Sequence, residues 1–120
     1  MTYKTIEYRK QGPVAYITLN RPQADNELDR ELATELAELC DEIQEDEAVS
    51  VVVLTGAGHY FSAGRDIKQA VLAGAGAAAA IGRLERIVIA TINGDALGPG
   101  LELALACDIR LAASGARLGM

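Results

Sequence analysis

The sequence predicts an α/β fold in which a mostly parallel sheet is flanked by helices. Two runs, residues 49–55 and 87–93, are rich in β-branched residues and nearly continuous in apolar ones, and each leads into a glycine-containing loop. Such runs are typical of strands that are buried on both faces of a parallel sheet. Helical patterns alternate with these runs through the second half of the chain, which indicates right-handed βαβ crossovers.

The first third of the chain predicts a hairpin followed by a helix. Residues 3–8 and 14–19 alternate in polarity, and residues 11–13 between them supply turn chemistry. From Asp29 onward, apolar residues recur at helical spacing and acidic residues occupy the other faces. Because Asp is a favoured N-cap, we expect an amphipathic, solvent-facing helix from there to near Glu47.

The second half predicts shorter elements. A helix is expected over residues 66–82, although three glycines interrupt its alanine-rich part. A glycine-rich turn at residues 94–100, a short apolar helix at 101–107 and a strand at 109–113 follow. Residues 116–120 contain no stop signal, and an open sheet edge would be exposed there. We therefore expect the single domain of residues 1–120 to be the front part of a longer protein.

The charge of the chain argues against a nucleic-acid partner. The formal net charge is −6, whereas a duplex-binding surface needs clustered Lys and Arg. The charge is unevenly spread, since residues 27–47 hold ten acids and one base. The remainder holds seven acids and ten bases, a net charge of +3, so it can still host an anionic ligand.

The cysteines and apolar runs indicate a cytoplasmic protein without a metal site or a membrane partner. Cys40 and Cys107 are far apart, and His59 is the only histidine, so zinc-type spacing is absent and a disulfide framework is not expected. The first residues lack the apolar core of a signal peptide, and no run approaches the ~18 apolar residues of a spanning helix.

Two glycine-containing loops, residues 56–64 and 93–100, each follow an expected strand and lead into an expected helix. Backbone N–H groups at such turns are aligned with a helix N-terminus, so they suit an anion or a developing oxyanion. Two loops of this kind can supply one donor each. The alternative is that the glycines only permit tight turns.

Nucleotide-binding motifs are weak or absent. Gly74, Gly76 and Ala79 match a loosened dinucleotide pattern, but no strand precedes them, and Phe61 replaces the third glycine after Gly56 and Gly58. A dinucleotide-binding oxidoreductase therefore remains only a minor alternative, which NAD binding would reveal. The chain contains no Walker-type phosphate loop.

Four blocks, in order along nearly the whole chain, resemble the enoyl-CoA hydratase/isomerase, or crotonase, family. They are VAYITLNRP (14–22), VVVLTGAG (51–58), FSAGRDIK (61–68) and INGDALGPGLELALACD (92–108). The resemblance implies a crotonase-like spiral of ββα turns, here incomplete, which binds an acyl-CoA thioester and stabilises its enolate in an oxyanion hole. It implies no cofactor, because coenzyme A is part of the substrate, and a homotrimer or hexamer when the protein is full length.

The resemblance also assigns residues to the oxyanion hole and the CoA site. Ala63 is expected to supply one backbone donor of the hole. The substrate-binding positions are Ala63, Gly64, Arg65, Asp66 and Ile67.

The second donor in this family is the middle residue of a glycine triplet, and here the sequence departs from the pattern. The triplet position reads Gly98-Pro99-Gly100, and Pro99 has no N–H to donate. Either Gly98 or Gly100 supplies the second N–H, or Ala63 acts alone. Loss of one oxyanion donor costs about 2.7–4 kcal/mol of transition-state stabilisation.

Glu102 matches the first acid/base glutamate of the family's hydratases, where a carboxylate beside the oxyanion hole can activate water or move a proton. Without the resemblance, it would be an acid favoured by the helix dipole. A hydratase uses a second glutamate, expected beyond Met120, whereas an isomerase moves the double bond with one base. The alternative function is a catalytically impaired acyl-CoA-binding or interaction protein of the same ancestry.

Overall fold

The computed structural model describes the backbone of residues 2–63 and 67–120, and the side chains of residues 2–63 and 75–120. The larger of two sheets has the strand order β1-β2-β3-β5-β7. Its strands are β1 (Ile6–Gln11), β2 (Val14–Leu19), β3 (Val51–Gly56), β5 (Ile87–Ile92) and β7 (Ile109–Ala112). Only the β1–β2 hairpin is antiparallel, so the prediction of a mostly parallel sheet is confirmed.

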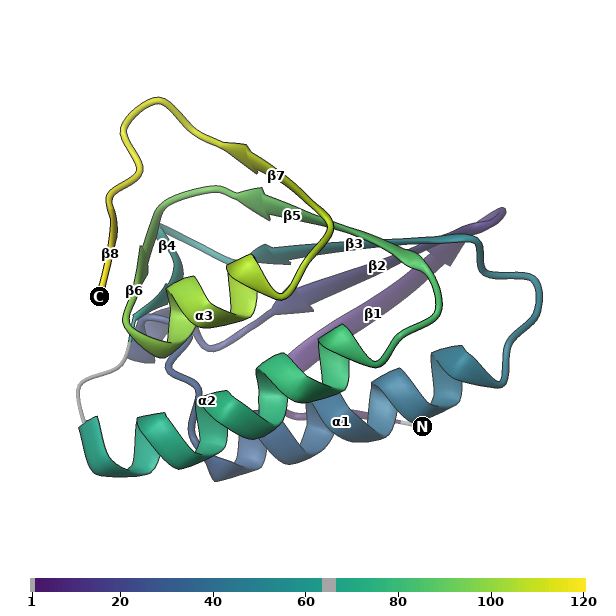
Figure 1. Cartoon of the computed structure of the whole chain (residues 1–120), viewed down its shortest axis with the longest axis horizontal. Helices are drawn as coiled ribbons and strands as arrows, with labels where there is room; N and C mark the ends of the chain where they lie inside the picture. The colour runs from purple at the N-terminus through teal and green to yellow at the C-terminus, as the bar shows by residue number, and fades with distance from the viewer. Residues whose placement is uncertain (1, 64–66) are drawn as a thin grey trace.

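A smaller parallel sheet stands at the end of the larger one where β3 and β5 finish (Figure 1). Its strands are β4 (Tyr60–Ala63), β6 (Asp95–Leu97) and β8 (Leu118–Gly119). The helices are the short η1 (Pro22–Ala24), α1 (Arg30–Gln44), α2 (Ile67–Gly82) and α3 (Pro99–Leu105). The chain therefore runs from the large sheet to the small sheet to a helix and back, which is a ββα spiral.

Helix α1 begins as expected but ends earlier than expected. The Asp29 carboxylate caps it by accepting a 2.9 Å hydrogen bond from the Leu32 amide. The sequence predicted an end near Glu47, whereas the helix ends at Gln44. The Asp46 carboxylate accepts from the Ala48 amide at 3.0 Å, and the Arg86 side chain donates to the Val49 carbonyl at 2.7 Å. These polar contacts turn the chain toward β3 before another helical turn can form.

The expectation that the two apolar runs are buried on both faces is wrong. Along β3 and β5, fully buried residues alternate with half-buried ones, and Ile87 is 52% exposed. The helices all lie against one face of the large sheet (Figure 1), so only side chains on that face enter the core. In the described part of the chain, no helix combines the length and apolarity needed to cross a membrane.

Strand β7 leaves one edge of the large sheet open and apolar. All four of its residues are exposed, and Leu111 has 60% of its surface accessible. Leu105 on α3 and Leu118 on β8 are also more than half exposed. An edge of this kind offers unpaired backbone groups together with apolar side chains to another chain.

We predict that the 120-residue chain self-associates through the β7 edge. Sedimentation velocity over a range of concentrations should show species larger than a monomer, and Leu111→Lys should reduce them because a lysine on an edge strand opposes pairing. Gln11→Lys, on the opposite edge strand β1, is the matched control and should leave association unchanged. A wild-type chain that stays monomeric at every concentration would contradict this prediction.

Glu35 attaches the segment before β1 to α1. Its carboxylate accepts hydrogen bonds from the Thr5 hydroxyl at 2.6 Å, from the Thr5 amide at 2.7 Å and from the Lys4 amide at 2.9 Å. Burial alone would raise the pKa of Glu35, but these hydrogen bonds outweigh it and hold the pKa below its ordinary value of 4.5.

Because this pKa is lowered in the folded state, the stabilisation from Glu35 is complete above the ordinary carboxyl pKa and is lost as the pH falls through the folded-state value. We therefore predict that wild-type protein loses more thermal stability than Glu35→Gln on acidification. Unfolding temperatures of the two proteins, compared from neutral to acidic pH, measure the difference. Parallel curves would show that Glu35 has the same pKa in both states.

Candidate functional site

The two glycine-containing loops lie side by side in the structure. Strand β4 pairs in parallel with β6, with Ser62 opposite Ala96 and Ala63 opposite Leu97. The end of β4 therefore lies beside the start of α3. A Cβ atom at Gly100 would lie only 2.1 Å from the Ser62 carbonyl oxygen. The first turn of α3 thus approaches β4 more closely than any side chain would allow.

Ala63 is not a free oxyanion donor in this structure, contrary to the expectation. Its N–H donates to the Asp25 carbonyl at 3.0 Å. Asp25 and Asn26 both adopt left-handed backbone conformations, with φ of 55° and 54°. This unusual turn after β2 brings the carbonyl of Asp25 to the end of β4, which occupies the Ala63 amide.

The structure also separates the alternatives at residues 98–100. The Gly98 N–H donates to the Gly119 carbonyl at 2.8 Å, so it is engaged in the small sheet. Gly98 precedes α3 with φ of 57° and ψ of −122°, a conformation that favours glycine. Pro99 occupies the first helical position, where a missing N–H leaves no intrahelical bond unmade. Gly100 follows in the first turn, where an N–H has no acceptor within the helix.

Glu102 lies in the same first turn of α3 and is exposed. Its backbone N–H donates to the Gly98 carbonyl at 3.1 Å, which closes the first turn of the helix. The helix dipole favours a carboxylate at this end. Glu102 therefore lies two residues after Gly100, at the end of α3 that faces β4. The carboxylate of Glu102 and the backbone amide of Gly100 thus belong to the same helical turn.

Most of the predicted CoA-binding residues lie outside the described part of the chain. Gly64, Arg65 and Asp66 lie outside the described residues, and so does the side chain of Ile67, with which α2 begins. The assignment of these four residues to a CoA site remains a prediction.

Two asparagines that the sequence analysis did not assign hold the loop between β3 and β4. Asn26, in the left-handed turn, and Asn93, at the end of β5, both donate to the Tyr60 carbonyl, at 2.9 and 3.3 Å. The available signal for Asn26 was its residue type, since Asn tolerates left-handed turns, whereas Asn93 stood where an expected strand meets a glycine loop.

The cysteines and the histidine have no catalytic role in this arrangement. Cys40 and Cys107 are buried and unpaired, and burial raises the pKa of each thiol to about 12. Both thiols are therefore packed in the core and held mainly in the protonated form. His59 lies exposed in the loop between β3 and β4. Among the residues that the structure describes, no three His, Cys, Asp or Glu side chains gather as metal ligands would.

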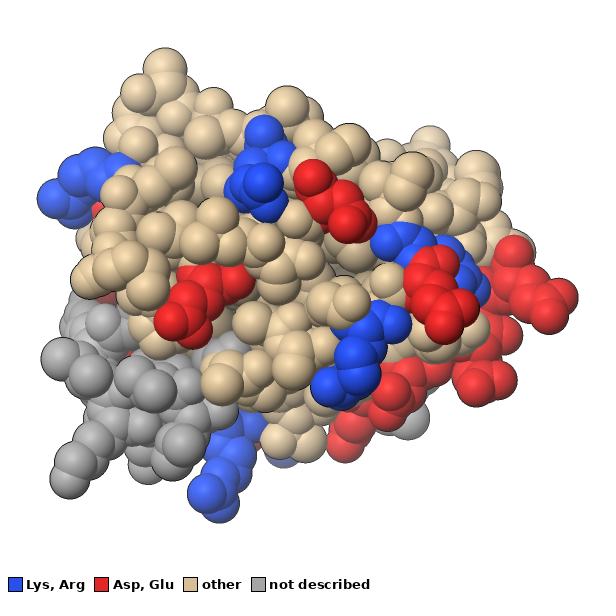
Figure 2. Space-filling view, viewed as in Figure 1, with Lys and Arg blue, Asp and Glu red and all other residues tan. Residues whose placement is uncertain are grey.

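Acidic side chains gather away from the meeting loops. Figure 2 shows them toward the lower right, where α1 ends, whereas Figure 1 places β4 and β6 on the left. Asp46, two residues after the end of α1, pairs with Lys10 at 2.7 Å. The end of the sheet that carries the loops is thus separated from the acidic end of α1.

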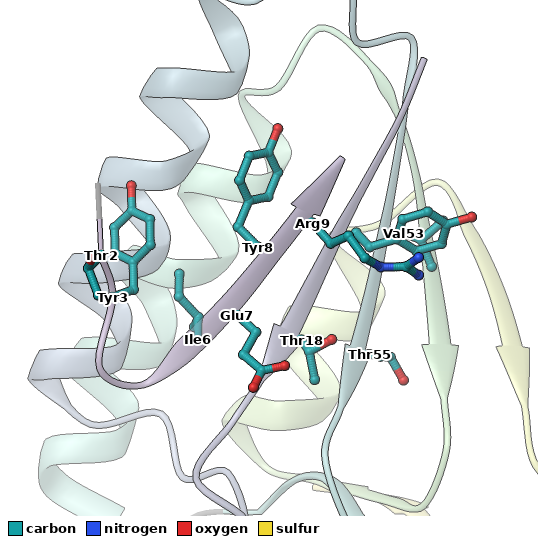
Figure 3. Close-up of a pocket in the computed structure, with 10 residues that line it drawn as sticks. Thr2, Tyr3, Ile6, Glu7, Tyr8, Arg9, Thr18, Val53 and Thr55 are labelled. Atoms are coloured by element: carbon teal, nitrogen blue, oxygen red, sulfur yellow. The ribbon is translucent and has the colours of Figure 1, made fainter. Parts of the chain in front are cut away.

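A cavity of about 530 Å³ lies elsewhere, around the edge strand β1, and is lined by residues from both faces of the sheet (Figure 3). The Arg9 guanidinium covers the Tyr16 ring there, 4.3 Å from its centroid. The side chains that reach it from the open sheet face are Glu7, Arg9, Tyr16, Thr18, Val53 and Thr55. None of these residues belongs to either glycine loop, so the cavity is not part of the candidate site.

A ββα spiral whose glycine loops meet at the ends of parallel strands is an α/β protein of the crotonase type. The sequence profile of the Enoyl-CoA hydratase/isomerase family matches residues 9–120. The chain belongs to this family.

Several relatives share both sequence and structure with the chain. The short-chain-enoyl-CoA hydratase of Clostridium acetobutylicum is 39% identical over an alignment of 131 positions, which covers 99% of this chain and 50% of that protein. An enoyl-CoA hydratase/carnithine racemase from Magnetospirillum magneticum superposes with a TM-score of 0.89 at 35% identity, covering 98% of this chain and 49% of that one.

A monofunctional enoyl CoA isomerase from M. smegmatis superposes with a TM-score of 0.85 at 40% identity, covering 95% of this chain and 52% of that one. Both hydratases and an isomerase are therefore among the similar proteins. The chain spans about half the length of the relatives it matches.

Gly100→Ala should destabilise the fold, although alanine is the better helix former. The added Cβ would meet the backbone of Ser62, so β4 or α3 must shift, and overpacking of this kind costs about 1–3 kcal/mol of unfolding free energy. Chemical denaturation measures the loss. Gly115→Ala is the control, because no atom lies within 4 Å of its added Cβ. Equal stability of the two variants would show that the close contact is not maintained.

Proposed function

We propose that this chain binds an acyl-CoA thioester and polarises its carbonyl, as part of an enoyl-CoA hydratase or isomerase. The observation that carries the proposal is the contact between β4 and the first turn of α3, which brings the two glycine loops and Glu102 to one place. The named hydratases and isomerase among the similar proteins support the same reaction class.

The chemistry needs stabilisation of negative charge on the thioester oxygen and a group that moves a proton. Backbone N–H groups at a helix N-terminus stabilise such charge, and the Gly100 amide is the first in α3, since Pro99 has none. Glu102 is the acid/base group for the carbon next to the thioester or for a water molecule. A hydratase would add water across the 2,3 double bond with a second acid, whereas an isomerase would relocate the bond with Glu102 alone.

The assembly and setting of the protein form part of the proposal. We assign it a homotrimer or hexamer when full length, as in the family it resembles, and no cofactor beyond the CoA of its substrate. The two free, buried thiols support a cytoplasmic location, because disulfides are rare in a reducing compartment.

Deuterium exchange at the carbon next to the thioester tests the proposal directly. A saturated short-chain acyl-CoA in heavy water should exchange its α-hydrogens when the chain is added, since exchange needs only carbonyl polarisation and one base. Titration calorimetry with the same acyl-CoA and with NAD measures binding. Binding of NAD in place of the acyl-CoA would refute the proposal in favour of an oxidoreductase.

A second candidate function is acyl-CoA binding without catalysis. The observation that favours it is the loss of donors at residues 98–100, where Pro99 lacks an N–H and that of Gly98 is engaged. Acyl-CoA affinity without α-hydrogen exchange would support this candidate over an enzyme.

Glu102→Gln should lower the rate of α-hydrogen exchange by about 10² or more, because proton transfer is lost while size and hydrogen bonding are retained. The dissociation constant for the acyl-CoA should change little. NMR of the exchanging substrate and calorimetry measure the two quantities. An unchanged exchange rate would show that Glu102 does not transfer the proton and only interacts favourably with the N-terminus of α3.

Pro99→Gly should raise the exchange rate by up to about 10²–10³, because it adds an N–H at the first position of α3, beside that of Gly100. The same substitution removes the fixed φ of proline and loosens the turn. Kinetics under the same conditions measure the balance. A lower rate would show that the rigidity of the turn matters more than the additional donor.

A further inference from the structure

The loop between β3 and β4 is held on one side by a fully buried asparagine. Asn26 has no exposed surface, and its amide nitrogen donates to the carbonyls of Ala57 and Tyr60, both at 2.9 Å. Its side-chain oxygen accepts from the Arg21 amide at 2.8 Å. Both amide donors are therefore used, one on the loop and one on the first residue of β4, and the oxygen accepts from its own turn.

A second asparagine holds the same loop from β5. The Asn93 amide nitrogen donates to the carbonyls of Gly58 and Tyr60, at 3.1 and 3.3 Å. Its side-chain oxygen accepts from the Gly56 amide at 3.0 Å. The Tyr60 carbonyl thus receives one hydrogen bond from each asparagine, and we call Asn26 and Asn93 the asparagine clamp.

The backbone of the Asn26 turn extends this hold along β4. The Asn26 carbonyl accepts from the Ser62 hydroxyl at 2.7 Å, and the Asp25 carbonyl accepts from the Ala63 amide at 3.0 Å. Both residues of the turn are left-handed, with φ near 55°, a conformation that Asp and Asn tolerate better than most side chains. Backbone strain of this kind persists where the surrounding structure enforces it, and it clusters at functional sites.

We propose that Asn26 and Asn93 are positioning residues for the thioester site. The clamp fixes the Tyr60 carbonyl, and hence β4, against the first turn of α3, where Gly100 has no room for a shift of the Ser62 backbone. The two asparagines therefore set the distance between the end of β4 and the segment that carries Gly100 and Glu102. This inference rests on the proposed function.

Aspartate substitutions replace each amide donor of the clamp with a carboxyl oxygen. Asn26→Asp and Asn93→Asp keep the size of the side chain and its accepting oxygen, but an ionised carboxylate cannot donate to the Tyr60 carbonyl. Asn20→Asp is the matched control, because the Asn20 amide donates to Glu7 at 3.1 Å and not to the loop. All three variants make the same Asn-to-Asp change.

Hydrogen exchange at the Ala63 amide, without ligand, reports whether the clamp holds β4. It should become about tenfold faster or more in both clamp variants and stay unchanged in Asn20→Asp. Exchange that is equally slow in all three variants would overturn the proposal. If Asn26→Asp fails to fold, exchange in Asn93→Asp decides between the two outcomes, because Asn93 is only half-buried and its substitution disturbs the core less.

The positioning role is tested with bound substrate. In wild-type protein, the infrared band of the thioester carbonyl should move to lower frequency on binding. In the clamp variants this shift should be lost. The maximal rate of α-hydrogen exchange should fall by a larger factor than the factor by which KM changes. An unchanged band and rate in folded clamp variants would overturn the positioning role. Wild-type protein that does not bind acyl-CoA would instead refute the proposed function, while the Ala63 amide still reports on the clamp.

Discussion

The contact between Gly100 and the backbone of Ser62 is the constraint on which the site depends. Because a Cβ at position 100 would lie 2.1 Å from the Ser62 oxygen, the small sheet and α3 come together only if this residue is glycine. The pairing of β4 with β6 sets the two loops side by side, and the asparagines then hold the loop that leads into β4. Close backbone contact and the hydrogen bonds of two asparagine side chains therefore organise this end of the molecule.

The large sheet and α1 were predictable because their signals are local. Each signal lies within a few neighbouring residues. The strands are indicated by β-branched runs, and α1 by the Asp29 cap and the helical spacing of the apolar residues that follow it. The small sheet was missed because β6 and β8 have only three and two residues, too few to carry a pattern. Burial on both faces was overestimated because the runs in β3 and β5 do not reveal that helices cover only one face.

The candidate site was predictable in its residues but not in its hydrogen bonds. The two loops were predicted from their glycines after expected strands, and the structure adds that they lie side by side. The engagement of the Ala63 amide depends on Asp25, and that of the Gly98 amide depends on Gly119. Both partners are distant in sequence, so no motif could indicate them.

The buried thiols have a consequence for oxidative damage. Peroxides react with thiolates, and Cys40 and Cys107 are held as thiols because burial raises the pKa of each to about 12. The folded chain thus resists sulfenic acid formation at both positions. Unfolding exposes them to solvent, so oxidised cysteine would accumulate in unfolded molecules and mark them chemically in a cell under oxidative stress.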